Sequence, residues 1–104
     1  MKQFLIRYKR GNGTEAQWHE DIQRFIAAVE GDLELAGKIG YRCMKLRDSA
    51  DYFHIATAAD DAAVKALQSR EFFKRYNEQT RLVAIGDVHV SPLDIVAETR
   101  AAPQ

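Results

Sequence analysis

Two strand-like segments, residues 38–47 and 52–57, are separated only by a short polar turn over residues 48–51. The side chains of both segments alternate with the period of two that is typical of strands. Strands joined by so short a link run antiparallel, as a hairpin. This hairpin restricts the fold more than any other feature, because consecutive strands of a parallel sheet need a long crossover between them.

A strand and a helix precede the hairpin. Residues 3–9 alternate, with Phe4, Ile6 and Tyr8 on one side, which predicts a strand. Thr14 is followed three residues later by a glutamine, the capping-box pattern that begins a helix. One apolar stripe at helical spacing then follows, formed by Trp18, Ile22, Phe25, Ile26, Val29 and Leu33.

A helical region and a fourth strand follow the hairpin. Residues 59–68 are rich in alanine and predict a helix, and Ser69 either ends that helix or caps a second segment that contains Phe72. Residues 82–90 predict the fourth strand. Ser91, which precedes a proline, has the pattern of a further helix start.

The resulting order is β-α-β-β-α-β, which predicts an α+β, ferredoxin-like fold. In this fold the four-stranded sheet is antiparallel, its spatial order is 4-1-3-2, and both helices cover one face. We expect residues 1–104 to form one domain, with residues 91–104 as a C-terminal extension. The other face of the sheet is then left without a helical cover.

The uncovered face favours a homodimer. Leu5 falls on it, together with either Met44 and Leu46 or Ile39 and Tyr41, depending on which side of the strand faces the helices. Packing two sheets together buries such residues, so we expect a symmetric homodimer in the form of a dimeric α/β barrel. A monomer with scattered exposed apolar groups is the alternative.

A polar cluster is a second hypothesis for the uncovered face. If Phe4 and its alternate neighbours face the helices, Arg7 faces the dimer side. We then expect Arg7 to pair with Asp87 and His54 to join them, because buried charges need partners. The alternative is that each of these side chains reaches water at a rim.

The loop of residues 11–16, GNGTEA, loosely matches a dinucleotide-binding fingerprint. That site needs a parallel sheet, and Glu15 in the first helical turn repels phosphate. We therefore interpret Gly11 and Gly13 as turn residues that are free to adopt a positive φ.

Composition narrows the function further. Fifteen basic and fifteen acidic residues give no net charge, so neither a nucleic acid nor a membrane is expected as a partner. The single cysteine, Cys43, and three histidines without ligand spacing predict no metal site. No signal peptide or membrane span is evident, so we expect a cytoplasmic protein, and no motif for a cofactor is present.

The stretch YFHIATAADDAAVKALQSREFF, residues 52–73, resembles the antibiotic biosynthesis monooxygenase-like domains of the dimeric α/β-barrel superfamily. The likeness rests on a strand, an acidic helix start and an L-x-S-x-x-F motif at Leu67, Ser69 and Phe72. It implies a small homodimer with a pocket between sheet and helices. Several members oxidise flat aromatic or quinol-like substrates without metal or flavin. Others degrade haem, but Ala66 stands where those often have a histidine.

Aromatic and polar side chains supply the candidate site. Its apolar walls are expected from Tyr8, Trp18, Phe53 and Phe72. Tyr76 and His54 are the candidate catalytic residues, with Tyr76 orienting or deprotonating the substrate. Two functions are compatible with these residues: a cofactor-independent monooxygenase-like enzyme for a flat hydrophobic molecule, and a non-catalytic, ligand-binding or stress-associated dimer with the same pocket.

Overall fold

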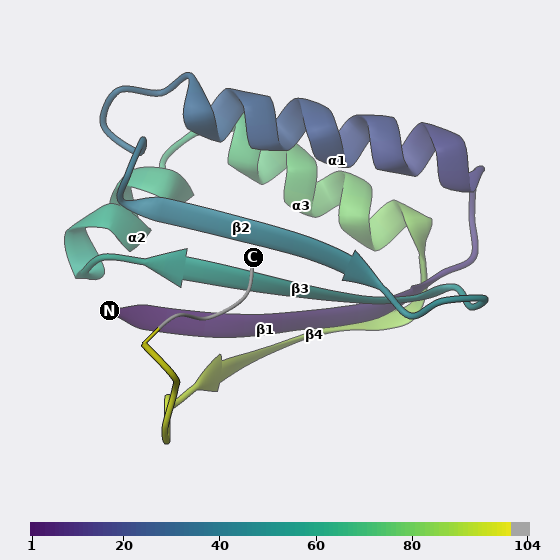
Figure 1. The fold of residues 1–104 in the computed structure, drawn as a ribbon. Coiled ribbons are helices and arrows are strands. Elements are labelled where there is room, and N and C mark those ends of the chain that lie inside the picture. The colour runs from purple at the N-terminus through teal and green to yellow at the C-terminus, as the bar shows by residue number, and fades with distance from the viewer. Residues whose placement is uncertain (101–104) are drawn as a thin grey trace.

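The structure is a computed structural model that describes residues 1–100 (Figure 1). Its elements, in chain order, are β1 (Lys2–Arg10), α1 (Glu15–Glu30), β2 (Ile39–Lys45), β3 (Asp51–Ala58), α2 (Asp61–Gln68), α3 (Glu71–Val83) and β4 (Ala84–Leu93). The strands form one sheet in the order β2-β3-β1-β4, and all neighbouring strands are antiparallel. The three helices lie on one face of this sheet. The predicted ferredoxin-like fold and its spatial order are therefore confirmed.

Local hydrogen bonds explain where the helices begin and end. Thr14 caps α1, because its hydroxyl oxygen accepts a hydrogen bond from the backbone N–H of Gln17 at 3.2 Å, as predicted. The predicted helical region after the hairpin is divided in two. Ser69 ends α2 and donates to the carbonyl of Ala66 at 2.7 Å, and Arg70 begins α3. A tight turn therefore separates the two short helices.

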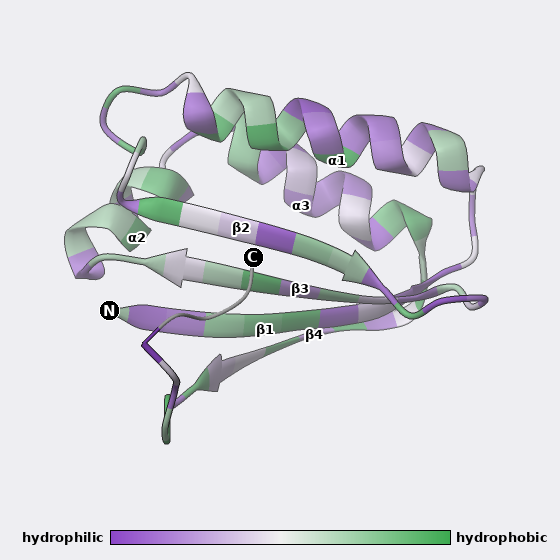
Figure 2. Cartoon of the chain, viewed as in Figure 1, coloured by the Kyte–Doolittle hydropathy of each residue, from purple (hydrophilic) through white to green (hydrophobic). Residues whose placement is uncertain are grey.

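The core lies between α1 and the sheet. Trp18, Ile22, Phe25 and Val29 of the predicted stripe are buried, and Figure 2 shows hydrophilic and hydrophobic stretches alternating along α1. The prediction that Leu33 continues the stripe is wrong. The helix ends at Glu30, so Leu33 lies in the following turn with 95% of its surface exposed.

The two glycines of the first loop have different roles. Gly13 adopts a φ of 74°, as predicted. Gly11 is free to adopt a positive φ but does not do so. The side chain of Ile85 occupies the space where a Cβ atom on Gly11 would lie, so close packing against β4 is the reason for a glycine there.

The fourth strand begins and ends later than predicted. Residues 82–83 complete α3, and β4 continues through Leu93. Ser91 is therefore not a helix cap, because residues 91–93 pair with residues 3–5 of β1. Pro92 lacks a backbone N–H and cannot donate a hydrogen bond to a neighbouring strand. It is tolerated because β4 is an edge strand, with a neighbouring strand on one side only. The C-terminal extension accordingly starts after Leu93.

The pairing register decides which side chains share a face. Ile6 pairs with His54 and Tyr8 pairs with Tyr52, so His54 faces the helices. Arg7 lies on the opposite face, and the prediction that His54 joins Arg7 in a polar cluster is wrong. Among residues 1–100, Arg7 and Asp87 form no ion pair. The ladder between β1 and β4 is irregular there, which interrupts the alternation on which that pairing depended.

The uncovered face is now defined. Leu5 pairs with Ile55, and Met44 pairs with Phe53, all on the side away from the helices. Tyr41, the alternative, faces the helices instead, where it contacts Phe25.

Candidate active site

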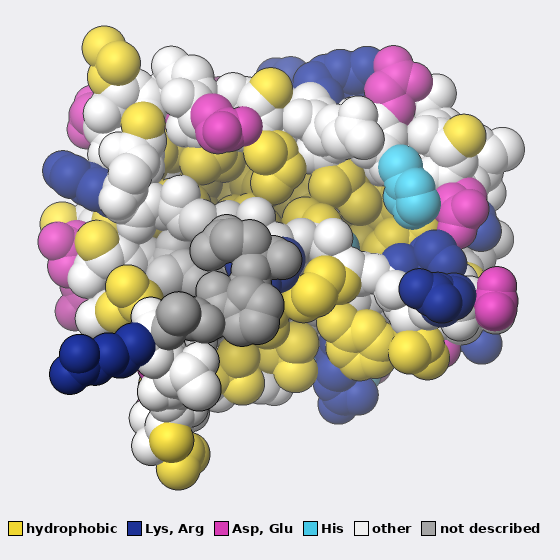
Figure 3. Space-filling model, viewed as in Figure 1, with side chains coloured by type: hydrophobic (Ala, Val, Ile, Leu, Met, Phe, Trp, Pro, Cys, Tyr) yellow, Lys and Arg dark blue, Asp and Glu magenta, His cyan; other side chains and the backbone are white. Residues whose placement is uncertain are grey.

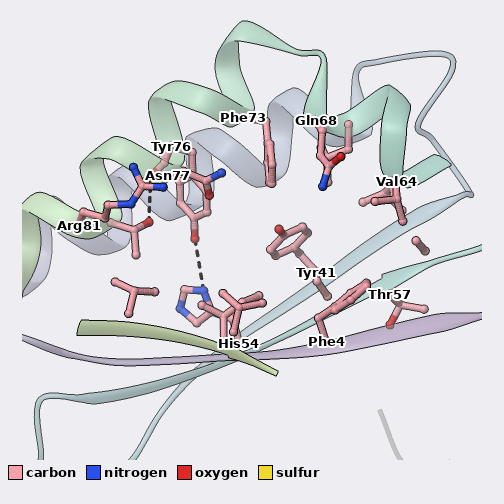
Figure 4. Close-up of a pocket in the computed structure, with 18 residues that line it drawn as sticks. Phe4, Tyr41, His54, Thr57, Val64, Gln68, Phe73, Tyr76, Asn77 and Arg81 are labelled. Carbon is pink, nitrogen blue, oxygen red and sulfur yellow. Dashed lines mark hydrogen bonds between the residues drawn. The ribbon is translucent and has the colours of Figure 1, made fainter. Parts of the chain in front are cut away.

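A cavity of about 330 Å³ lies between the sheet and helices α2 and α3 (Figure 4). Its volume is at the lower end of the range for small-molecule pockets. Phe4, Ile6 and Ala56 belong to the sheet side, and Leu67 and Phe73 belong to the helical side. Most of the wall is apolar, so the cavity suits a small hydrophobic molecule.

A chain of buried polar groups ends at this cavity. The indole Nε1 of Trp18 donates to the hydroxyl of Tyr8 at 2.8 Å. That hydroxyl lies 3.0 Å from Nε2 of His54, and Nδ1 of His54 lies 3.3 Å from the hydroxyl of Tyr76. His54 and Tyr76 line the cavity, whereas Trp18 and Tyr8 lie behind it. Three separate elements, α1, β1 and β3, thereby fix the polar group that α3 presents.

The direction of the chain depends on the tautomer of His54. The indole of Trp18 can only donate, so it occupies one lone pair of the Tyr8 oxygen. In one of the two neutral tautomers, the Tyr8 proton is donated to Nε2 of His54. Neutral His54 then carries its proton on Nδ1 and donates to Tyr76. In this tautomer His54 does not take the hydroxyl proton of Tyr76, for which the thiol of Cys43 and a ligand in the cavity are the remaining acceptors.

Burial sets the protonation states. It lowers the pKa of His54 to about 4, so the imidazole is neutral at neutral pH. Burial also raises the pKa of Tyr76 and that of Tyr41 well above the usual value for tyrosine. Tyr76 is therefore a hydrogen-bond donor and not a base. Of the two roles considered from the sequence, the structure favours orienting the substrate over deprotonating it.

Packing holds Tyr76 in place. Its ring is stacked on Phe25 with 3.9 Å between ring centroids and an interplanar angle of 2°. Trp18 stacks less closely on Tyr76, with centroids 5.8 Å apart. A hydroxyl held on such a rigid ring loses little rotational freedom when it binds a ligand.

The other predicted wall residues lie elsewhere. Tyr8 and Trp18 support the cavity from behind, as described above. Phe72 is not part of the wall and packs 6.1 Å from Phe25, measured between ring centroids. The prediction that Phe53 walls the cavity is wrong, because its pairing with Arg7 places it on the uncovered face of the sheet.

Most of the residues that line the cavity are absent from the candidate wall residues chosen from the sequence. Tyr41, Phe73 and Arg81 all line the cavity. Tyr41 occupies the same side of β2 as Cys43, which pairs with His54. Strand alternation would have indicated Tyr41 once the helix-facing side of β2 was known. Arg81 could be identified only once α3 was known to extend to Val83.

A second hollow lies between α1 and β2, and Figure 3 shows hydrophobic side chains gathered in it beside a histidine. His19, Ile22 and Cys43 are among its lining residues, and Tyr41 lines both this hollow and the cavity. Nε2 of His19 lies 2.8 Å from the hydroxyl of Tyr52. Burial raises the pKa of Cys43 to about 11, so its thiol is protonated and a poor nucleophile.

Residues 1–100 contain neither a metal-ligand cluster nor a membrane-spanning helix. No group of three or more histidine, cysteine, aspartate or glutamate side chains is arranged as metal ligands would be. Within the same residues, no helix has the length and apolar character needed to cross a bilayer. The cytoplasmic location stays a prediction.

Comparisons with known proteins give a consistent result for the fold. No protein-family model and no curated protein matches the sequence. SnoaB, a cofactor-independent oxygenase from Streptomyces nogalater, superposes with a TM-score of 0.77 at 16% identity, over 96% of this chain and 97% of that one. A candidate antibiotic biosynthesis monooxygenase from Caulobacter crescentus gives a TM-score of 0.76 at 15% identity, over 92% and 90%.

A further crystal structure, of an antibiotic biosynthesis monooxygenase, gives a TM-score of 0.74 at 14% identity, over 93% of this chain and all of that one (100%). The resemblance found in residues 52–73 is thereby confirmed at the level of the fold. The chain has the ferredoxin-like fold of the antibiotic biosynthesis monooxygenase-like proteins.

Proposed function

We propose that this protein is a cofactor-independent monooxygenase that oxidises a flat, electron-rich aromatic molecule held between the sheet and helices α2 and α3. The observation that carries the proposal is a rigid hydrogen-bond donor, Tyr76, at the wall of a largely apolar cavity. The likeness to SnoaB supports the proposal, since that protein is a cofactor-independent oxygenase with the same fold.

An anthrone-type substrate fits these groups. Loss of a proton from its CH₂ group gives an enolate, whose negative charge is concentrated on oxygen, and Tyr76 donates a hydrogen bond to that oxygen. The carbanion carbon gives electrons to O₂ and forms a hydroperoxide. Loss of water then leaves a carbonyl. One oxygen atom of O₂ enters the product and the other leaves as water, with both hydrogens of the CH₂ group.

The cavity lacks a strong base. Among residues 1–100, no aspartate or glutamate lines it, and burial lowers the pKa of His54 to about 4. Water therefore takes the proton of the substrate, and the protein contributes by stabilising the enolate and by excluding bulk solvent. It follows that turnover should rise with pH as more of the substrate ionises.

Oxygen uptake with anthrone, in the presence of a chelator and without added flavin, tests the proposal. Replacing Tyr76 with phenylalanine removes one donor to the enolate and should lower kcat by about a hundredfold. Tyr52→Phe is the matched control, because Tyr52 is a buried tyrosine that does not line the cavity. Binding of anthrone without turnover would contradict the enzyme and favour the ligand-binding dimer. An unchanged kcat in Tyr76→Phe would leave that side chain only a packing role.

We also propose that the uncovered face of the sheet forms a homodimer. Leu5, Phe53 and Ile55 are only partly buried there, and Met44 is 41% exposed. Contiguous apolar side chains of this kind mark interaction surfaces, and two copies of a sheet face pack well against each other. The dimer is independent of the oxygenase proposal, since the cavity lies on the other side of the sheet.

A further inference from the structure

The described residues that line the cavity include a positively charged side chain and no negatively charged one. Among its eighteen lining residues there is no aspartate and no glutamate, and Arg81 supplies the only lysine or arginine side chain. Neutral amides of Gln68 and Asn77 are also present. A ligand with a negative group therefore meets one cation and no carboxylate.

Arg81 lies at one end of the row of helical residues that line the cavity. Figure 4 shows Arg81 on one side of Tyr76, with Phe73 and Gln68 on the other side. Arg81 is exposed, so its guanidinium is accessible to solvent. Within residues 1–100, Arg81 takes part in no ion pair.

Asn77 adds a second polar side chain at the end of the cavity where Arg81 lies. It precedes Arg81 by four residues on α3, so the two side chains share one face of the helix. Asn77 is half-buried, whereas the hydroxyl of Thr80 already donates to the backbone carbonyl of Tyr76 at 2.8 Å. The amide of Asn77 and the fork of Arg81 together offer the donors that a carboxylate accepts.

A basic residue in the last turn of a helix also complements the negative end of the helix dipole. That role needs only a position near the helix end. It does not require the side chain to line a cavity that contains no acid, so helix stabilisation does not account for the whole arrangement.

We propose that the cavity binds an aromatic molecule that carries a carboxylate. The carboxylate lies at Arg81 and Asn77, and the rings lie beside Phe73 with Tyr76 between the two ends. This assignment rests on the proposed function only in taking the cavity as the ligand site. It narrows the substrate class from flat aromatic molecules to flat aromatic acids.

Calorimetric titration with two matched ligands tests the proposal. 3-Hydroxy-2-naphthoate carries the carboxylate, and 2-naphthol is the same ring system without it. Wild type should bind the naphthoate about tenfold more tightly at low ionic strength, as expected for a partly solvated charged hydrogen bond. Arg81→Gln should abolish this preference and leave the affinity for 2-naphthol unchanged. Arg81→Lys should restore part of the preference.

Arg75→Gln is the matched control, because Arg75 is an exposed arginine of α3 that does not line the cavity. An equally large loss in Arg75→Gln, equal affinities of wild type for both ligands, or no binding of either would overturn the carboxylate assignment. Oxidation of neutral anthrone is measured separately. Turnover without a preference for the carboxylate would contradict only the carboxylate assignment. A preference for the carboxylate without turnover would contradict only the proposal that the protein is an oxygenase.

Discussion

Acid should destabilise this protein through a single histidine. His54 has 1% of its surface exposed, and burial lowers its pKa from 6.5 to about 4. Between these two values the unfolded chain binds a proton at this position and the folded chain does not. The free energy of unfolding therefore falls as the pH decreases from 6.5 towards 4. Above pH 6.5 the stability that depends on neutral His54 is fully present.

The size of the effect follows from the shift. A shift of one pKa unit corresponds to about 1.4 kcal/mol. Over the whole pH range between the two pKa values, the free energy of unfolding therefore changes by about 3 kcal/mol. Between about pH 7 and about pH 5 the loss is about 2 kcal/mol, because only part of that range is crossed. A domain of this size is typically stable by about 5–15 kcal/mol, so the loss is easily measured.

Urea denaturation at these two pH values, at one fixed protein concentration, is the assay. In His54→Gln an amide replaces the imidazole and keeps a hydrogen-bonding group beside Tyr8, so the variant should lack the loss of about 2 kcal/mol. His89→Gln, which changes an exposed histidine, should behave as wild type. Carboxylates titrate alike in all three proteins and cancel in the comparison. Identical pH dependence in wild type and His54→Gln would refute the reasoning.

Two further predictions concern the cavity and the uncovered face. Ala56→Leu should fill the cavity, weaken binding of 2-naphthol at least about tenfold, and change the free energy of unfolding by no more than about 1 kcal/mol. Exposed Ala62→Leu is its control by calorimetry and urea denaturation, and undiminished binding would contradict the cavity as the ligand site. Ile55→Lys should convert the dimer to a monomer in sedimentation velocity, because a symmetric interface would bury two unpaired charges. A wild-type monomer at micromolar concentration would contradict the dimer.

The order of the elements was predictable because it depends on local patterns. The hairpin, the alternation of β1 and the cap at Thr14 are properties of short stretches of chain. The break at Ser69 was predicted only as one of two possibilities, since a serine both ends and begins helices. Residues 82–83 were assigned to the strand because an apolar pair fits the end of α3 as well as the start of β4.

The site was less predictable because it depends on register. The direction in which Tyr8 points was left conditional, and Phe53 was placed at the cavity. His54 was assigned both to the cavity with Tyr76 and to a cluster with Arg7, although one side chain faces only one side of the sheet. Both errors have one cause: a strand shifted by a single residue presents every side chain to the opposite face. The pairing of Ile6 with His54 is a contact between distant parts of the chain, and alternation within either strand does not determine it.

The same register explains why the site has a rigid polar part and an open apolar part. Along β3, the side chains that face the helices are Tyr52, His54, Ala56 and Ala58, in that order. The two large residues fill the space at their end, where the hydrogen bonds to His54 are formed. The two alanines occupy far less of the space beneath α2 and α3, and both line the cavity. Tyr76 lines the cavity and its hydroxyl contacts His54, so Tyr76 stands at the boundary between the packed part and the open part.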